Sequence, residues 1–270
     1  MSKIDKHYYL RPQLKGKVCL IVNWTSVKRV FLTIAIILPT YNERENLQEL
    51  VPRILEVLKG YGIDGHIIVV DDASPDGTGT FAQELANKHG RVTVIIREKK
   101  LGIGSAYKEG FRTALSRGFE GLIEMDADGS HDPLVIPEFV EKLEEGYELV
   151  IGSRYVAGGK TPAWSLGRRT ISKITGSFTR LLFGLTTHDP TSGFRAFRAT
   201  SLKKIDLSEV KSDGYAFQVE MVARYEKMGL RVCEIPIEFV DRVKGKSKLG
   251  ATALLRFMKT ILRLFFELCR

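Results

Sequence analysis

The chain has 270 residues, of which 44% are hydrophobic and 27% are charged, and it carries a formal net charge of +9. Such a composition suits a globular core and excludes a fibrous or largely disordered chain. The three cysteines, Cys19, Cys233 and Cys269, form no CxxC pair, so neither a zinc site nor a disulfide framework is expected. The expected compartment is the reducing cytoplasm.

The positive charge lies mainly at the two ends of the chain. Residues 1–30 hold seven Lys or Arg against one acidic residue, residues 242–270 hold eight against one, and the body between them is slightly acidic. The sequence has no basic stripe interleaved with aromatic residues, so a nucleic-acid partner is not expected. Basic ends on a slightly acidic body suit an anionic membrane surface instead.

The first half of the chain alternates β-branched runs with helical patterns. Strands are expected at residues 31–38, 66–70, 92–96, 121–125 and 148–152. Between the first two, apolar residues recur at helical spacing from Leu47 to Leu58. This repeated order predicts an α/β fold with a mostly parallel central sheet flanked by helices.

The second half holds longer polar segments. We expect a loop that leads into a helix over residues 152–173, a polar turn over 189–198, a helix over 213–229 and a last strand over 231–240. No internal repeat or long linker divides this part of the sequence. We therefore expect a basic extension over 1–30, a single domain over 31–248 and an amphipathic helical tail over 249–270.

Polar segments follow four of the predicted strands. "PTYNERENL", "VVDDASPDGT", "MDADGSHDP" and "GSRY" close the first, second, fourth and fifth strands. Ligands bind at the carboxyl ends of strands in open α/β sheets, so these segments predict a substrate crevice. Asp126 and Asp128 are separated by one residue, so their side chains point to the same side of an extended chain. Such a pair suits a divalent cation shared with substrate phosphates, and an ordinary acidic turn is the alternative.

Two familiar nucleotide motifs are incomplete. A GxGxxG motif that starts at Gly102 would need glycine where the chain has Tyr107. "GGKT" at 158–161 lacks the P-loop glycine, because Arg154 stands in its place. Neither GxSxG nor a Cys/His pairing with motif spacing is present, so no nucleophile for covalent hydrolysis is visible.

Eight motifs occur in one order over roughly residues 31–250. They are "PTYNERENL", "VVDDASPDGT", "LGIGSAYKEGF", "MDADGSHDP", "GSRYVAGG", "DPTSGFRAFR", "GYAFQVEM" and "GKSKLG". In this order they resemble the inverting glycosyltransferases of family 2, and within it the polyprenyl-phosphate (dolichyl-phosphate) mannose synthases. The resemblance implies a GT-A (Rossmann-like) fold, transfer of mannose from GDP-mannose to a polyprenyl or dolichyl monophosphate, and Mg²⁺ or Mn²⁺ as cofactor.

The resemblance also implies roles for individual residues. The nucleotide sugar would be bound by Pro39, Tyr41, Glu43, Asp72, Asp126, Ala127, Asp128, Ser130, Arg242 and Lys248, with Lys246 beside them. Asp126 and Asp128 would hold the metal, although some relatives carry Gln where this chain has Ser130. The acceptor phosphate would be bound by Arg154, Arg168, Arg169 and Ser172. The catalytic residues implied are Asp128, Arg154 and Arg242.

A lipid phosphate needs no general base, because it is already ionised near neutral pH. His131 and His188 are therefore expected to be structural. The acceptor implies a peripheral position on the cytoplasmic face of a membrane, with residues 249–270 in the interface. Packing of this helix on the protein body, or on a small integral-membrane partner subunit, is the alternative. Transfer from UDP-glucose, or nucleotide-sugar binding without turnover, also remains open.

Overall fold

The computed structural model describes residues 32–241 and 251–268, which belong to one compact unit. The elements in chain order are β1 (Ile34–Thr40), α1 (Arg44–Gly60), β2 (Gly65–Asp71), α2 (Thr78–Lys88), β3 (Val92–Ile96), α3 (Ile103–Ser116), β4 (Gly121–Glu124), the 3₁₀ turn η1 (Pro133–Val135), α4 (Ile136–Glu144), β5 (Leu149–Ser153), α5 (Leu166–Phe183), β6 (Arg195–Arg198), α6 (Ala199–Leu202), α7 (Tyr215–Lys227), β7 (Val232–Pro236) and α8 (Ala251–Leu268).

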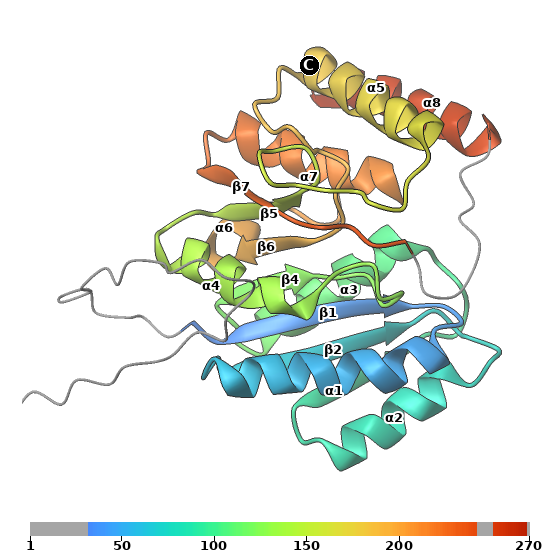
Figure 1. The fold of residues 1–270 in the computed structure, drawn as a ribbon, viewed down its shortest axis with the longest axis vertical. Coiled ribbons are helices and arrows are strands. Elements are labelled where there is room, and N and C mark those ends of the chain that lie inside the picture. Colours follow the sequence, from blue (N-terminus) through green and yellow to red (C-terminus); the bar gives the residue numbers. More distant parts are fainter. Residues whose placement is uncertain (1–31, 242–250, 269–270) are drawn as a thin grey trace, which may run out of the picture. The chain divides into compact units, whose positions relative to one another are not determined.

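The strands form one sheet in the order β3-β2-β1-β4-β6-β5-β7 (Figure 1). β1 pairs in parallel with β2 and β4, β2 with β3, and β5 with β7. β6 is inserted between β4 and β5 and runs antiparallel to both. The expected mostly parallel sheet flanked by helices is confirmed.

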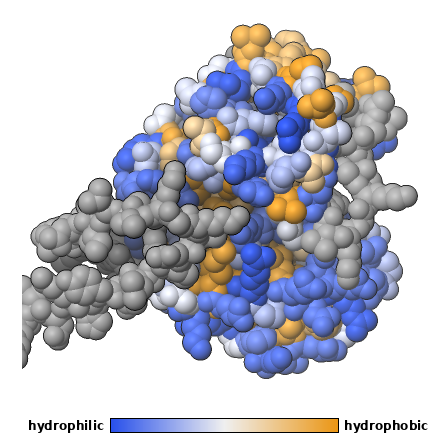
Figure 2. Space-filling view, viewed as in Figure 1, coloured by the Kyte–Doolittle hydropathy of each residue, from blue (hydrophilic) through white to orange (hydrophobic). Residues whose placement is uncertain are grey.

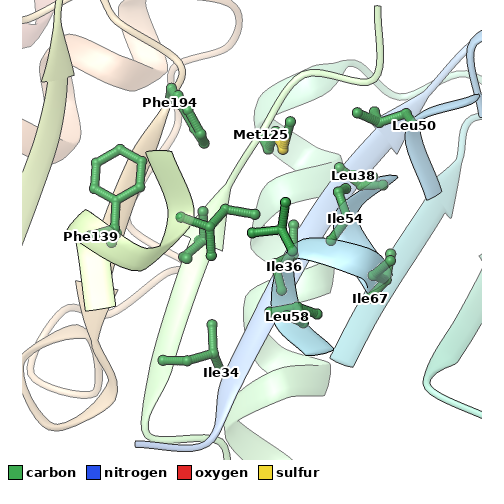
Figure 3. Packing of buried hydrophobic residues seen from close by; sticks show 14 of the residues in the cluster. Ile34, Ile36, Leu38, Leu50, Ile54, Leu58, Ile67, Met125, Phe139 and Phe194 are labelled. Carbon is green, nitrogen blue, oxygen red and sulfur yellow. The ribbon is translucent and has the colours of Figure 1, made fainter. Parts of the chain in front are cut away.

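The sheet is covered on both faces. Ile34, Ile36 and Leu38 of β1 belong to a core cluster with α1, α2 and α4, and Figure 3 shows this packing. Ala35 and Ile37 point to the other face and join the cluster beneath α3 and α7. This alternation follows from the two-residue period of a strand. Burial of each large apolar side chain contributes about 1.5–3 kcal/mol.

Most strands lie where the sequence predicts them. The second to fifth predicted strands are confirmed to within one residue at each end. β1 continues two residues beyond its predicted end, because pairing with β2 extends to Thr40 opposite Asp71. The predicted polar turn over 189–198 is wrong at its end, where residues 195–198 form β6. Ala196 and Phe197 lie buried on opposite faces of the sheet, which gives this short strand its place in the core.

Two amphipathic helices that are distant in the sequence, α5 and α8, pack together. α5 begins at Ser165, whose hydroxyl accepts the N–H of Arg168 at 3.3 Å, and ends at Gly184 in the left-handed region with φ 66°. Ile261 and Leu264 of α8 are buried in a small cluster that includes side chains of α5 and α7. No helix within the described ranges combines the length and the apolar character needed to cross a bilayer.

Candidate active site

A pocket lies beyond the carboxyl ends of β4, β5 and β7. It is lined by Asp126, Asp128, His131, Arg154, Trp164, Arg168, Thr191, Ser192, Gly193, Tyr215, Phe239 and Asp241. Parallel strands bring the segments that follow them to the same edge of a sheet. Because β6 runs antiparallel, the segment that precedes it reaches this edge as well. The pocket thus gathers segments that lie far apart in the sequence.

Asp126 and Asp128 enter this pocket from the segment after β4. Asp126 accepts a hydrogen bond of 3.1 Å from the hydroxyl of Tyr107. Burial and the nearby Asp126 raise the pKa of Tyr107, so its hydroxyl keeps its proton and donates. Oδ1 of the buried Asp128 accepts from the backbone N–H and the hydroxyl of Ser130, at 3.0 and 2.6 Å. Ala127, which separates the two aspartates in the sequence, is buried as well. Ser130 therefore orients Asp128.

His131 holds the same segment through a hydrogen bond to its backbone. Its Nδ1 accepts the backbone N–H of Asp126 at 3.1 Å, and its ring stacks on Phe194 with centroids 4.6 Å apart. Burial lowers the pKa of His131 to about 4, so the ring is neutral at neutral pH. A neutral ring that accepts at Nδ1 carries its proton on Nε2. This is a structural role of the kind expected for His131, although the ring also lines the pocket.

A buried acidic residue and a buried arginine lie on β4 and β6, close in sequence or space to Asp126. Glu124 and Arg195 are directly opposite each other in the β4–β6 register, and neither side chain is exposed. Burial raises the pKa of Glu124 to about 8, against the opposing effect of Arg195. Burial lowers the pKa of Arg195 to about 10. Sequence reasoning missed this pair, because the two residues are brought together only by the insertion of β6.

Arg154 is held by a second buried acid, Asp189. The backbone N–H, Nε and Nη2 of Arg154 donate to Asp189 at 3.0, 2.7 and 2.6 Å, and Nη2 also donates to the hydroxyl of Thr191 at 2.9 Å. Burial lowers the pKa of Arg154, but the adjacent Asp189 reverses this effect and raises it overall. Arg154 therefore brings a fixed positive charge to the pocket.

Arg168 lines the pocket from the first turn of α5. Its guanidinium lies 4.1 Å from the ring centroid of Trp164, and its Nη1 donates to Asp241 at 2.5 Å. Trp164 lies at the same time 5.2 Å from the guanidinium of Arg154. Both cations thus lie within cation–π distance of one indole at a wall of the pocket. Trp164 and Phe239 were not predicted, since isolated aromatic residues carry no motif spacing, and Tyr215 lies in the motif "GYAFQVEM", to which no site role was given.

The other two predicted acceptor ligands lie outside the pocket lining. Nη2 of Arg169 donates to the carbonyl of Thr161 at 2.6 Å. The hydroxyl of Ser172 accepts from the hydroxyl of Tyr155 at 2.6 Å. Both contacts tie α5 to the loop that follows β5. Their predicted role in acceptor binding stays a prediction.

Three residues predicted for the nucleoside, Pro39, Tyr41 and Glu43, lie at the end of β1 or just after it, beyond the pocket lining. Pro39 belongs to β1, and the ring of Tyr41 has the ammonium of Lys100 3.3 Å from its centroid. Glu43 stands before α1 and accepts from the side chain of Asn46 at 2.5 Å. Their position at a strand end is the expected one, and their contact with a nucleoside stays a prediction.

Asp72 is buried after β2. It accepts from Nη1 of Arg97 at 2.6 Å and from the backbone N–H groups of Leu101 and Gly102 at 3.1 and 2.9 Å. These bonds hold the segment between β3 and α3. Arg242, Lys246 and Lys248, predicted to contact the sugar diphosphate, lie outside the described residues.

The two carboxylates of the pocket suit a divalent cation by chemical type. Asp126 and Asp128 supply the hard oxygen ligands that Mg²⁺ and Mn²⁺ prefer. In the part of the chain that the structure describes, no group of three or more His, Cys, Asp and Glu side chains could hold a metal ion. Mg²⁺ is commonly bound by one or two carboxylates together with substrate phosphates. The pair therefore fits a cation that shares its coordination with a diphosphate.

Comparisons with known proteins agree with this geometry. The model of "Glycosyl transferase family 2" matches residues 35–206. A polyprenol monophosphomannose synthase of Mycolicibacterium smegmatis is 45% identical over 218 residues, which cover 80% of this chain and 81% of that protein. An undecaprenyl-phosphate mannosyltransferase of Micrococcus luteus is 45% identical over 214 residues, covering 79% and 86%.

Solved structures share the fold. The crystal structure of glucosyl-3-phosphoglycerate synthase from Mycobacterium tuberculosis with UDP matches with a TM-score of 0.63 and 19% identity, covering 88% of this chain and 80% of that one. This likeness confirms the expected GT-A fold. Together with the family model and the two relatives, it leads to one conclusion: the chain belongs to glycosyl transferase family 2.

Proposed function

We propose that the protein transfers mannose from GDP-mannose to a polyprenyl monophosphate at the cytoplasmic face of a membrane. The observation that carries this proposal is the pairing of Asp126 and Asp128 with Arg154 and Arg168 in one pocket. Carboxylates at one wall suit a metal-bound diphosphate, and arginines at the other suit a second phosphate. The names of the two relatives at 45% identity support mannose as the sugar and a polyprenyl phosphate as the acceptor.

On the donor side, Asp126 and Asp128 would hold Mg²⁺ or Mn²⁺. A bound cation of this kind neutralises charge on a departing diphosphate. The chain prepares both carboxylates in advance, since Tyr107 and Ser130 donate hydrogen bonds to them. A neighbour in fold, glucosyl-3-phosphoglycerate synthase, has been crystallised with Mn²⁺ and UDP-glucose, which supports a divalent metal.

On the acceptor side, Arg154 and Arg168 would orient the lipid phosphate. An oxygen of that phosphate then attacks the anomeric carbon on the side opposite the departing GDP, with inversion. The phosphate is ionised near neutral pH and needs no base to remove a proton. His131 is the one histidine among the described lining residues, and its Nδ1 already accepts the backbone N–H of Asp126, so the ring has no free acceptor for a proton. Positioning and charge stabilisation would supply the rate enhancement.

The helices α5 and α8 offer a surface for the membrane. Leu166, Ile171, Ile174 and Leu181 of α5 and Leu255, Leu262 and Phe266 of α8 are exposed. Apolar side chains also gather in Figure 2 where Figure 1 shows these helices. Arg256, Lys259 and Arg263 add exposed positive charge on α8. Apolar side chains with adjacent cations suit an anionic lipid interface.

Helix α5 connects this surface to the pocket. α5 presents Arg168 to the pocket in its first turn and exposes Leu181 in its last. An acceptor could therefore place its phosphate at Arg168 while its polyprenyl chain stays in the membrane beneath α5. One side of α8 packs on the protein body, and this packing leaves the exposed side of α8 for the proposed membrane contact.

The test is a transfer assay with purified full-length protein. GDP-mannose, UDP-glucose and UDP-N-acetylglucosamine, each labelled in the sugar, are offered in parallel with polyprenyl phosphate and Mg²⁺ or Mn²⁺. We expect label in the lipid phase from GDP-mannose, and none from it without metal. Label from UDP-glucose alone would make the protein a glucosyltransferase, and no transfer from any donor would reject the proposal.

A further inference from the structure

Residues 189–195, here called the 189–195 segment, join the two sides of the pocket. The segment precedes β6, which lies between β4 and β5 and runs antiparallel to both. Its residues therefore pass between Asp126, which follows β4, and Arg154, which follows β5. The sequence motif "DPTSGFR" covers this segment, and its two ends, Asp189 and Arg195, are charged.

One end of the segment fixes Arg154. Asp189 is fully buried and accepts from Nε and Nη2 of Arg154, at 2.7 and 2.6 Å. The hydroxyl of Thr191 accepts a further bond from Nη2 at 2.9 Å. Charge-assisted bonds of this length define the plane of a guanidinium group. The rotation and position of the Arg154 side chain thus follow from this end of the segment.

Hydrogen bonds from the backbone and from a side chain of the segment also hold it to neighbouring strands. The N–H of Asp189 donates to Glu234 of β7 at 2.9 Å. The hydroxyl of Ser192 donates to the carbonyl of Gly152 in β5 at 2.6 Å. These bonds are buried or partly buried, where competition from water is weak. The segment is therefore held at both β5 and β7.

The middle of the segment lies against Asp126. A Cβ atom at Gly193 would stand 3.6 Å from each carboxylate oxygen of Asp126, so the backbone passes close to that carboxylate. The next residue, Phe194, stacks on His131, and His131 accepts the N–H of Asp126. Phe194 also packs edge-on against Phe139 of α4, with centroids 4.7 Å apart (Figure 3). Side chain and backbone of Asp126 are both in reach of the segment.

The other end is anchored by Arg195. Its guanidinium is fully buried and donates from Nη1 to the carbonyl of Gln218 in α7 and from Nη2 to the carbonyl of Pro190, at 2.6 and 2.7 Å. The second bond closes a loop within the segment, and the first ties that loop to α7. Glu124 and Ile151 are its cross-strand neighbours. A buried arginine in this place fixes the loop between two walls of the pocket.

We propose that the 189–195 segment is a positioning element that sets the place of Arg154 relative to Asp126, and that Thr191 and Arg195 are its positioning residues. The assignment of the Arg154 side to the acceptor and of the Asp126 side to the donor rests on the proposed function. The position of the Arg154 side chain does not depend on that function, and it can be measured without substrate.

The sharpest test compares two buried threonines. Thr191→Val removes the hydroxyl that binds Arg154, whereas Thr187→Val removes one that donates to Glu226 at 2.6 Å, away from the pocket lining. Both changes keep the side-chain shape. The readouts are the Nε–H signal of Arg154 in ¹⁵N-labelled protein, assigned by its loss in Arg154→Lys, the melting temperature, the affinity for GDP with Mn²⁺, and kcat and KM for polyprenyl phosphate.

We expect Thr191→Val to shift the Arg154 signal and to lower kcat/KM for the acceptor on the order of tenfold, because a bond to a charged group is lost. Affinity for GDP with Mn²⁺ should stay unchanged. Thr187→Val should change the melting temperature alone. Arg195→Lys keeps the charge but loses the planar fork whose two terminal nitrogens each bind one carbonyl, so it should lower the donor affinity and the acceptor kcat/KM together.

Two outcomes would overturn the inference. The first is an Arg154 signal and an acceptor kcat/KM in Thr191→Val that match those of Thr187→Val. The second is a folded Arg195→Lys variant with wild-type values for both substrates. If the wild type transfers no mannose while Thr191→Val alone still shifts the Arg154 signal, the positioning element stands and the proposed function is rejected instead.

Discussion

Asp189 accepts three hydrogen bonds from Arg154, one from its backbone N–H and two from the Nε and Nη2 edge of its guanidinium. The side chains of both residues are almost completely buried. The edge of the guanidinium that could bind a phosphate through two parallel bonds is therefore directed at the protein. A phosphate in the pocket would meet the remaining side of Arg154 as a fixed point charge.

Arg154→Lys should lower both stability and acceptor use. Lysine keeps the charge but not the planar pair of donors, so the buried Asp189 loses partners at a cost of about 1–3 kcal/mol. We expect a lower urea midpoint and a lower kcat/KM for polyprenyl phosphate, with affinity for GDP and Mn²⁺ retained. Arg91→Lys is the control, because its ion pair with Asp64 is exposed. Equal effects of the two substitutions would contradict the account.

Asp128→Asn should abolish metal-dependent donor binding. The substitution keeps the shape of the side chain, but the pocket loses one of its two proposed cation ligands. Calorimetry with GDP, with and without Mn²⁺, measures the effect. Asp132→Asn is a matched control in the same turn, since Asp132 caps η1 and pairs with Arg53 on the surface. Unchanged metal-dependent affinity in Asp128→Asn would remove Asp128 from the donor site.

The fold explains why some features could be predicted from the sequence and others could not. Continuous β-branched runs mark strands such as "HIIVV", which become β2. β6 has four residues and follows Pro190 and Gly193, so its pattern resembles a turn. Its insertion between β4 and β5 depends on contacts far apart in sequence, and periodicity within a short segment cannot reveal them.

The site shows the same limit. Asp126, Asp128 and Arg154 were predicted from motifs at strand ends, and the structure brings them into one pocket. Their supporting partners Tyr107 and Asp189 lie 19 and 35 residues away along the chain. Asp189 opens a motif that the sequence displays, which is the one signal that could have identified it.

Serine substitutions on the exposed side of α5 and α8 should weaken membrane binding. Leu181→Ser and Phe266→Ser remove side chains that are 86% and 65% exposed, so stability should hardly change. If these side chains enter the acyl boundary, each change should reduce sedimentation with anionic liposomes on the order of tenfold, since burying such a group contributes about 1.5–3 kcal/mol.

Leu134→Ser is the control, because Leu134 is exposed at η1, outside these helices. Equal liposome binding by all variants would reject the surface. Truncation after Leu249 would be a less specific experiment, because it removes buried as well as exposed side chains of α8. It removes Ile261 and Leu264, which cover Ala216 and Val219 of α7, and so lowers stability.

Cys233 should react slowly with thiol reagents in the folded protein. Burial raises the pKa of its thiol from 9.0 to about 11, so the thiol stays protonated at pH 9 and the reactive thiolate is about 50-fold scarcer than for a thiol with the ordinary pKa. Mass spectrometry after iodoacetamide treatment, mapped to the Cys233 peptide, measures the rate. We expect the native rate at pH 9 to lie far below the rate in urea. Comparable rates would contradict the burial of this thiol at β7.

Product analysis tests the central claim most directly. Purified protein is incubated with GDP-mannose, polyprenyl phosphate and Mn²⁺, and the lipid product is examined by NMR at the anomeric carbon. Direct attack by the lipid phosphate on the α-linked donor predicts a β-linked mannosyl phosphate, formed in equal amount with GDP and absent with Asp128→Asn. An α-linked product, or release of GDP with free mannose and no mannosyl lipid, would contradict the account.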